Sequence, residues 1–117
     1  MIKTILLIVL GIFFILNGIN HFLNTHIYNE YAAKKGLFSP NLMVKLSGVL
    51  LIFGGLTLAS GFLRLFGIIG LSIFLVIASF TIHQFWNENT NEKKLLEAMH
   101  FSKNIAILTE LIYVAIS

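Results

Sequence analysis

Residues 5–16 read ILLIVLGIFFIL, twelve consecutive positions without a polar side chain. The apolar character extends beyond both ends of this stretch, so a helix is predicted from about 2 to 22. A run of about 20 apolar residues is long enough to cross the hydrocarbon core of a membrane. The charged start also resembles a signal peptide, but no cleavage site of the small-x-small type follows it. We therefore expect an uncleaved first membrane helix.

The composition of the whole chain agrees with this interpretation. Of 117 residues, 57% are hydrophobic and only 11% are charged, and the mean hydropathy is +0.90. Soluble domains carry about 25% charged residues. The net charge of +3 is small and the basic residues are scattered, so we expect no nucleic-acid partner. Without cysteine, the chain has no disulfide and no thiol chemistry of its own.

Three further apolar segments follow the first. They predict an all-α fold, an integral membrane four-helix up-and-down bundle that forms a single transmembrane domain, 1–117. Gly54, Gly55 and Gly61 in the second span would allow close contact between helices. The predicted spans cover about 2–22, 40–63, 66–85 and 101–117, and short interfacial helices are predicted at about 26–35 and 90–99.

Local signals set these bounds. Gly36 is expected to close the first interfacial helix in the left-handed conformation. Ser39-Pro40 is expected to start the second span, with Ser39 as the N-cap and Pro40 in the first turn. Trp86 is expected to end the third span in an interfacial aromatic belt. Asn89 and Glu92 have the spacing of a capping box, which would leave the following apolar residues on the surface: Leu95, Leu96 and Met99.

Polar residues gather at one predicted side of the membrane. Four of them recur at three- and four-residue spacing and share one face of the first helix, namely Asn17, Asn20, His21 and Asn24. The ends of the first and third spans and the starts of the second and fourth lie on the same side, which adds Lys45, His83, Gln84, His100, Lys103 and Asn104. We interpret this polar vestibule as a candidate ligand or proton site, because polar groups in a span point into the bundle or a wet cavity.

Structural interpretations of the same residues remain open. Asn and Gln often join membrane helices by hydrogen bonds worth about 0.5–2 kcal/mol. Imidazole is a common axial ligand of haem, but His21 and His83 lie near predicted interface depth, where a hydrated histidine is ordinary. We expect no metal, no haem and no cofactor held by this chain, with a quinone as the one cofactor it would contact.

Glu110 lies near the middle of the last apolar segment, seven residues beyond Lys103 and so about 10 Å deeper. A charge at that depth costs several kcal/mol unless it is neutralised, paired or hydrated. Two structural explanations are a protonated carboxyl hydrogen-bonded between helices and an ion pair with Lys45. The functional explanation is a group that accepts protons or binds a cation, so Glu110 joins the candidate site.

Five short motifs in a fixed order resemble the DoxX family of small four-span membrane proteins, and they extend over nearly the whole chain. They are Gly18-Ile19-Asn20-His21-Phe22, Gly54-Gly55-Leu56, Gly61-Phe62-Leu63-Arg64, His83-Gln84-Phe85-Trp86 and Phe101-Ser102-Lys103-Asn104. The family name derives from a subunit of a thiosulfate:quinone oxidoreductase. The resemblance implies a four-helix membrane bundle associated with redox partners, and it implies no catalytic mechanism.

This chain departs from the family pattern at two places. Many relatives carry a glutamate in the second helix where this chain has Leu51, and glycines in the fourth helix where it has Thr109-Glu110. One hypothesis is that a carboxylate at similar depth has moved from the second helix to the fourth.

The distribution of basic residues bears on orientation. Six of the eight lie in or beside the two long loops: Lys34, Lys35, Lys45, Lys93, Lys94 and Lys103. Lys3 and Arg64 lie on the other side with the amino terminus. Counting basic residues places the loops in the cytoplasm, whereas the resemblance implies that both termini are cytoplasmic. We expect the family arrangement, in a bacterial cytoplasmic (inner) membrane.

Three classes of function remain open. The first is an accessory, redox-linked subunit of a membrane complex, not catalytic alone. The second is a stand-alone protein that binds a quinone or another small molecule, and the third is a small proton-coupled multidrug-type transporter. The expected partners are the lipid bilayer, redox protein subunits and further copies of the chain. Nucleophile-elbow, nucleotide-binding and paired-carboxylate patterns are absent from the sequence.

Overall fold

The computed structural model describes residues 1–117 and is entirely helical. The chain divides into two compact units, Met1–Leu71 and Ser72–Ser117. The helices are α1 (Ile2–Leu23), α2 (Thr25–Lys34), α3 (Pro40–Ser60), α4 (Arg64–Thr81), a 3-10 turn η1 (Phe85–Asn87) and α5 (Asn91–Ile116).

Three segments are long and apolar enough to cross a membrane: Ile2–Leu23, Pro40–Ser60 and Arg64–Asn87. Their outer faces carry many exposed apolar side chains, such as Val9 on α1, Val49 on α3 and Ile73 on α4. Exposed apolar faces of this extent suit contact with lipid. The fold is therefore all-helical, as predicted. The first three of the four predicted spans correspond to these three segments. The predicted fourth span lies in α5, which is not one of them.

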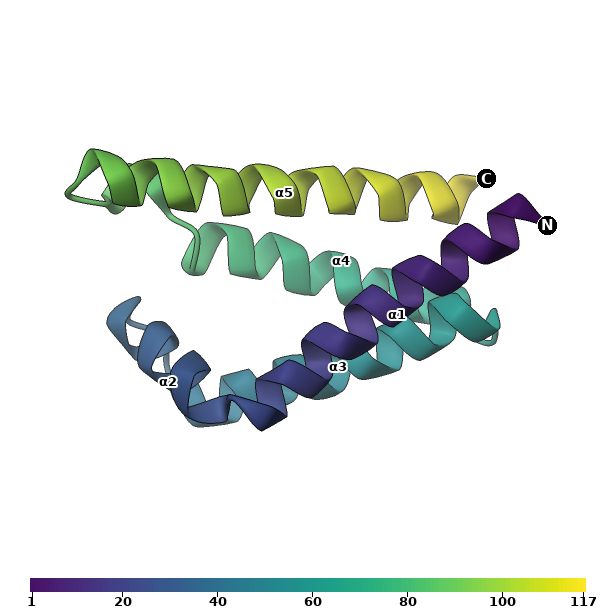
Figure 1. Cartoon of the computed structure of the whole chain (residues 1–117), viewed down its shortest axis with the longest axis horizontal. Helices are drawn as coiled ribbons and strands as arrows, with labels where there is room; N and C mark the ends of the chain where they lie inside the picture. Colours follow the sequence, from purple (N-terminus) through teal and green to yellow (C-terminus); the bar gives the residue numbers. More distant parts are fainter. The chain divides into compact units, whose positions relative to one another are not determined.

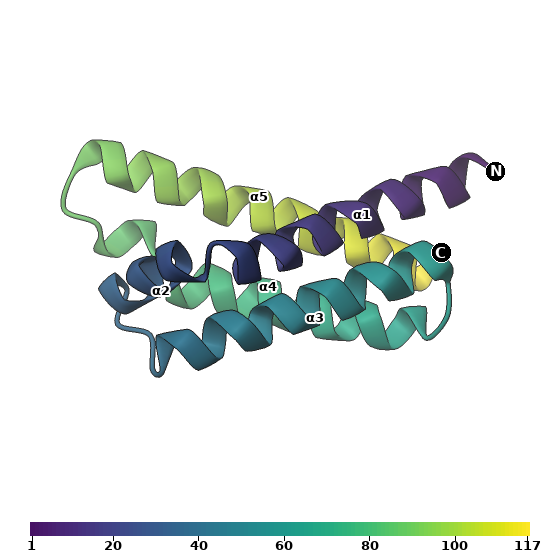
Figure 2. The same ribbon diagram turned by 60° about the horizontal axis from the view of Figure 1, so that its bottom comes forward.

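In the first unit, α1 and α3 lie side by side along most of their length (Figures 1 and 2). Glycines make this approach possible. A Cβ atom on Gly11 would lie 2.5 Å from the backbone oxygen of Gly55, and one on Gly18 would lie 2.7 Å from that of Gly48. The two pairs show that the helices run antiparallel. Larger residues at these positions would force the backbones apart, so the small-residue packing fixes the α1–α3 pair.

The turn from α3 to α4 begins earlier than predicted. Gly61 adopts the left-handed conformation (φ 84°) and ends α3 at Ser60, three residues before the expected end. Only glycine takes this conformation without strain, which explains the early stop. The Nη2 of Arg64 donates to the Leu58 carbonyl at 3.2 Å and so satisfies one of the last carbonyls of α3. Gly61 is thus a helix cap and not a helix contact.

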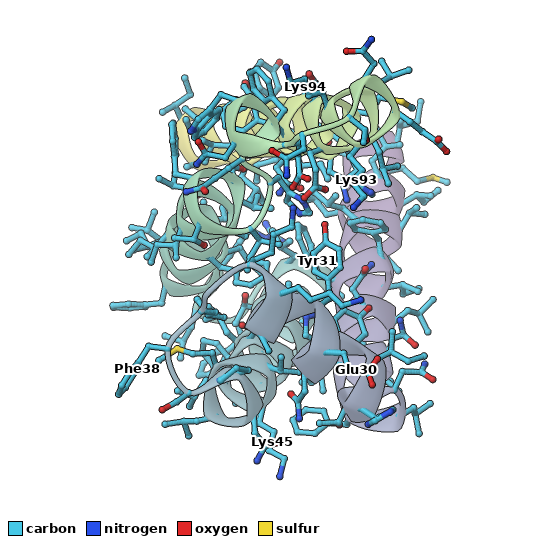
Figure 3. All side chains as sticks on the ribbon, turned by 90° about the vertical axis from the view of Figure 1, so that its left-hand side faces the viewer. Glu30, Tyr31, Phe38, Lys45, Lys93 and Lys94 are labelled. Atoms are coloured by element: carbon cyan, nitrogen blue, oxygen red, sulfur yellow. The ribbon has the colours of Figure 1, made fainter.

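A helix, α2, is present where the first interfacial helix was predicted, and Gly36 follows it with φ 75°, as expected for a left-handed stop. Its place at a membrane interface stays a prediction. Ser39 is the N-cap of α3 as predicted, but its side chain makes no capping hydrogen bond, and it is itself left-handed (φ 46°). Figure 3 shows Phe38 pointing outward from this loop and Lys45 pointing away from α3. Phe38 is 80% exposed, a position that suits an aromatic anchor at a membrane interface.

In the second unit, the predicted helices 90–99 and 101–117 are one continuous helix, α5. The change from polar to apolar sequence near His100 suggested a break, but residues 91–116 contain no proline or glycine to make one. The capping prediction was displaced by one residue, because the N-cap is Thr90. Its side chain accepts a hydrogen bond from the backbone N–H of Lys93 at 3.2 Å. As expected, the apolar residues of the first turns are exposed, namely Leu95, Leu96 and Met99.

Candidate functional site

The end of α1 and the start of α2 form a polar cluster that we call the α1 cluster: Asn17, Asn20, His21, Asn24 and Tyr28. The rings of His21 and Tyr28 are stacked, with centroids 4.1 Å apart and planes 22° apart. The Asn20 amide donates to the Tyr28 hydroxyl at 2.7 Å and accepts a hydrogen bond from Asn24. The expected shared helix face therefore meets α2 through a hydrogen-bonded network.

His21 has a defined tautomer in this network. Its Nδ1 lies 2.7 Å from the backbone oxygen of Asn17, which only accepts hydrogen bonds, so Nδ1 carries the proton and donates. In the neutral ring Nε2 is then the acceptor. The Asn17 amide donates to the backbone oxygen of Phe13 at 2.7 Å, within α1. Asn17 thus supports the helix and His21, whereas His21 retains an acceptor nitrogen.

A second cluster, the His83 cluster, lies in the second unit and consists of His83, Glu97 and His100. The Nδ1 of His83 lies 3.2 Å from Oε1 of Glu97, and the two side chains are 16% and 3% exposed. His83 follows the end of α4, while Glu97 and His100 are one turn apart on α5. The rings of His83 and His100 are stacked, with centroids 4.9 Å apart. Lys103 lies near enough to interact with His83 electrostatically.

Two further buried polar residues each lie four positions along the chain from a member of this cluster. Ser79 is fully buried, and its hydroxyl has no hydrogen-bond partner. It precedes His83 by four residues, and so lies one turn earlier. Asn104 is 5% exposed and follows His100 by four residues on α5. A buried hydroxyl without a partner costs about 1–3 kcal/mol, which makes Ser79 a position where a ligand atom or a water would be stabilised.

Aromatic side chains hold α4, η1 and α5 together around the His83 cluster. Phe101 on α5 makes edge-to-face contacts with Phe80, Phe85 and Trp86, with ring centroids 5.3–5.9 Å apart. Such pairs contribute about 0.5–1.5 kcal/mol each beyond the area they bury. The opposing pairs Phe80–Phe101 and His83–Glu97 show that α5 runs antiparallel to the end of α4. The aromatic contacts therefore set the register that brings His83 to Glu97.

The geometry of the His83 cluster suits proton exchange and hydrogen bonding better than metal binding. The planes of the two imidazole rings are only 26° apart, so their in-plane nitrogen lone pairs do not converge on a common point. No group of three or more His, Cys, Asp or Glu side chains is arranged to hold a metal ion. The buried carboxylate and the imidazole can instead share and transfer a proton.

The remaining predicted site residues have other surroundings. The Gln84 amide donates to the Phe80 carbonyl at 2.6 Å and its oxygen accepts from Asn87 at 2.9 Å, so it closes the end of α4. Lys45 is exposed on α3, near the level of His21, since Gly48 contacts His21. Glu110 is exposed on α5, whereas Leu51, the position compared with it in the sequence analysis, is 2% exposed.

The structure adds Glu97 to the candidate residues and brings His100 into the centre of the second cluster. The sequence analysis assigned residues 90–99 to a short interfacial helix and did not identify Glu97 as a candidate. One signal was available: Glu97, Asn104 and Leu111 recur every seven residues, which places them on one face of a continuous helix. All three are buried. The hypothesis that both clusters form one vestibule stays a prediction.

Comparison with protein-family models matches DoxX over residues 2–84, well over half of the 117 residues. The match covers α1 to α4 and includes the α1 cluster and His83, whereas α5 with Glu97, His100 and Glu110 lies outside it. No curated protein and no solved structure matches the chain. The length of the family match is decisive, and the chain belongs to the DoxX family.

Proposed function

We propose that this integral membrane protein crosses the membrane four times and serves as an accessory, redox-linked subunit of a larger membrane complex, without catalysis of its own. The fourth crossing is the apolar part of α5, about residues 101–116, and the preceding turns of α5 lie outside the hydrocarbon. A continuous helix of 26 residues is about 39 Å long, and its apolar part makes up about 24 Å of this length, at the short end for a crossing.

The observation that carries the subunit role is the exposure of Glu110. Its neighbours from 105 to 116 are mostly apolar, and several are exposed, including Ile112 and Ile116. An exposed carboxylate at hydrocarbon depth is costly against lipid and becomes stable against a protein partner that neutralises or hydrogen-bonds it. The link to redox chemistry rests on the family resemblance.

The direct test is purification from native membranes in mild detergent, with mass spectrometry of the bound proteins and an absorption spectrum of the same sample. The subunit role predicts a redox protein at a fixed molar ratio to this chain. A chain that purifies alone or only with copies of itself would contradict the role and favour a stand-alone binding protein or transporter.

The proposed location is a bacterial cytoplasmic membrane with both termini in the cytoplasm. The positions of the loop lysines oppose this orientation and the family arrangement supports it. The natural chain has no cysteine, so Lys93→Cys gives a unique label site at the start of α5. Labelling by an impermeant maleimide in intact cells would support the proposed orientation. Protection of Lys93→Cys from the label would show the opposite orientation.

A second candidate function is binding of a quinone or a similar small molecule, and the His83 cluster favours it. A quinone headgroup needs a few hydrogen-bonding groups beside apolar or aromatic walls. His83 and Glu97 supply the polar groups, and Phe80 and Phe101 supply the aromatic ones.

The single tryptophan, Trp86, provides the readout for this second candidate. Trp86 lies three residues beyond His83 and contacts Phe85 and Phe101. A quinone bound at the His83 cluster would therefore quench the fluorescence of Trp86. We expect saturable quenching by a short-chain ubiquinone analogue, reduced at least tenfold in affinity by His83→Phe. Linear, unsaturable quenching in every variant would exclude a site near Trp86.

A further inference from the structure

The exposed face of α5 carries a regular pattern. Residues spaced alternately three and four apart are all exposed along it, and we call this set the α5 stripe: Leu96, Met99, Lys103, Ala106, Glu110 and Tyr113. This is the spacing of the contact positions in a pair of packed helices. The buried face of the same helix is formed by Glu97, Asn104 and Leu111. The helix therefore has a second face of exposed residues with the spacing of a helix contact.

Two features adapt the α5 stripe to a neighbouring helix. Ala106 lies between the two charged residues, and a small residue at this position lets another helix approach closely. Lys103 and Glu110 are two turns apart, so their charges are separated by about 10 Å along the helix axis. A helix seated on the stripe meets a positive group near the loop end and a negative group deeper in the membrane.

The order of the charges selects among partners. A second copy in the same orientation would place Lys103 against Lys103 and Glu110 against Glu110, and like charges in contact oppose association. A copy in the opposite orientation would pair Lys103 with Glu110. It would also require copies of the chain to insert into the membrane in both orientations. A different chain meets neither difficulty.

We propose that the α5 stripe docks a membrane-spanning helix of another protein, which places a basic or amide side chain opposite Glu110 and an acidic or amide side chain opposite Lys103. This inference rests on the proposed role as a subunit and adds the surface and the chemistry of the partner. Charge complementarity at two depths fixes the register of the partner helix, and Ala106 is the point of closest approach.

Photocrosslinking in native membranes tests the proposal. Benzoylphenylalanine replaces Ala106 in the stripe or, as a matched control, Ile112, which is 51% exposed on another side of α5. We expect a discrete protein adduct from position 106 and at least tenfold less from position 112. The crosslinked peptide should come from a membrane-spanning segment that contains a basic or amide side chain within two turns of the crosslink.

Charge variants in the same crosslinking background complete the test. Glu110→Leu should reduce the adduct at least tenfold and Glu110→Gln should reduce it less, because the amide keeps a hydrogen bond. Glu92→Gln, an exposed acid in the first turn of α5, should leave the yield unchanged. Membrane levels and detergent elution profiles check that each variant folds. If Glu110→Leu does not fold, the nearly isosteric Glu110→Gln still tests the role of the carboxylate.

Three outcomes would overturn the proposal: an adduct with another copy of this chain, an adduct mainly from position 112, or a yield insensitive to Glu110→Leu. Its failure is separable from failure of the subunit role. A partner that co-purifies at a fixed ratio but does not crosslink through position 106 contradicts the docking surface alone. A chain that purifies without a partner contradicts both.

Discussion

Glu97 and Glu110 lie on the same helix, thirteen residues apart, and have opposite environments. Glu97, from the polar first half of α5, is 3% exposed and contacts His83. Glu110, from the apolar second half, is exposed. Thirteen residues turn the helix by about 220°, so the two carboxylates point to different sides. Distance along the helix sets the depth of a residue, but its angle around the axis decides what it contacts.

The largest effect is expected from Glu97→Ala. It leaves a buried imidazole N–H without its acceptor and opens a cavity, so the free energy of unfolding should fall by about 3–5 kcal/mol. Thermal unfolding in detergent, followed by size-exclusion chromatography, measures the loss. Glu97→Gln keeps an acceptor oxygen and should lose less than half as much. Equal stability of Glu97→Ala and the natural chain would show that the buried contact with His83 is not stabilising.

Leu111→Ala tests the buried face of α5 without changing a polar group. Leu111 is fully buried, and removing its side chain should cost about 2–4 kcal/mol through the cavity it leaves. Ile112→Ala is the matched control, because Ile112 is 51% exposed and its truncation should cost less than about 1 kcal/mol. The same thermal assay compares the two, and similar losses would remove the distinction between the faces.

Ser79→Ala tests whether the buried hydroxyl of the second unit contributes to stability or to binding of the quinone analogue. In the isolated chain the hydroxyl has no partner, so its removal should leave stability unchanged or raise it by about 1 kcal/mol. Thermal unfolding measures this change, and quenching of Trp86 by the quinone analogue measures binding. A destabilised variant would show that the hydroxyl is satisfied in the native protein.

The smallest effect on the isolated chain is expected from Glu110→Leu. An exposed side chain contributes little to folding, so the free energy of unfolding should change by less than about 0.5 kcal/mol in detergent. Assembly with a partner should nevertheless be lost. A large loss of stability in the purified chain would mean that Glu110 acts within the fold, as both structural explanations require.

The elements of the fold were predictable where strong local rules apply. Apolar length located α1, α3 and α4, and Gly36 and Ser39 marked the limits of α2 and α3 as expected. Gly61 was identified as a contact residue because glycine serves both close packing and left-handed caps, and local sequence does not separate the two uses. Separate helices were predicted on the two sides of His100, although the sequence there has no proline or glycine that would favour a break.

The candidate site was predictable in part. His21, Asn20 and Asn17 were found from their spacing on one helix, a local property. Burial of Glu97 depends on the register of α5 against α4, which the Phe80–Phe101 and His83–Glu97 contacts determine. The register between two helices depends on tertiary contacts, so the hydropathy of the sequence does not predict it. Glu97, in a segment predicted to be interfacial, was therefore missed, whereas the apolar neighbourhood of Glu110 drew attention to an exposed acid.

The most direct test of the account is the molar ratio of partner to chain after mild-detergent purification from native membranes, measured for the natural chain and for Glu110→Leu in parallel. We predict a fixed ratio with a redox protein for the natural chain and at least a tenfold lower ratio for Glu110→Leu, with equal amounts of the chain in the membrane. A natural chain that purifies without a partner, or a ratio unchanged by Glu110→Leu, would contradict the claim that the exposed carboxylate of α5 joins this protein to a membrane complex.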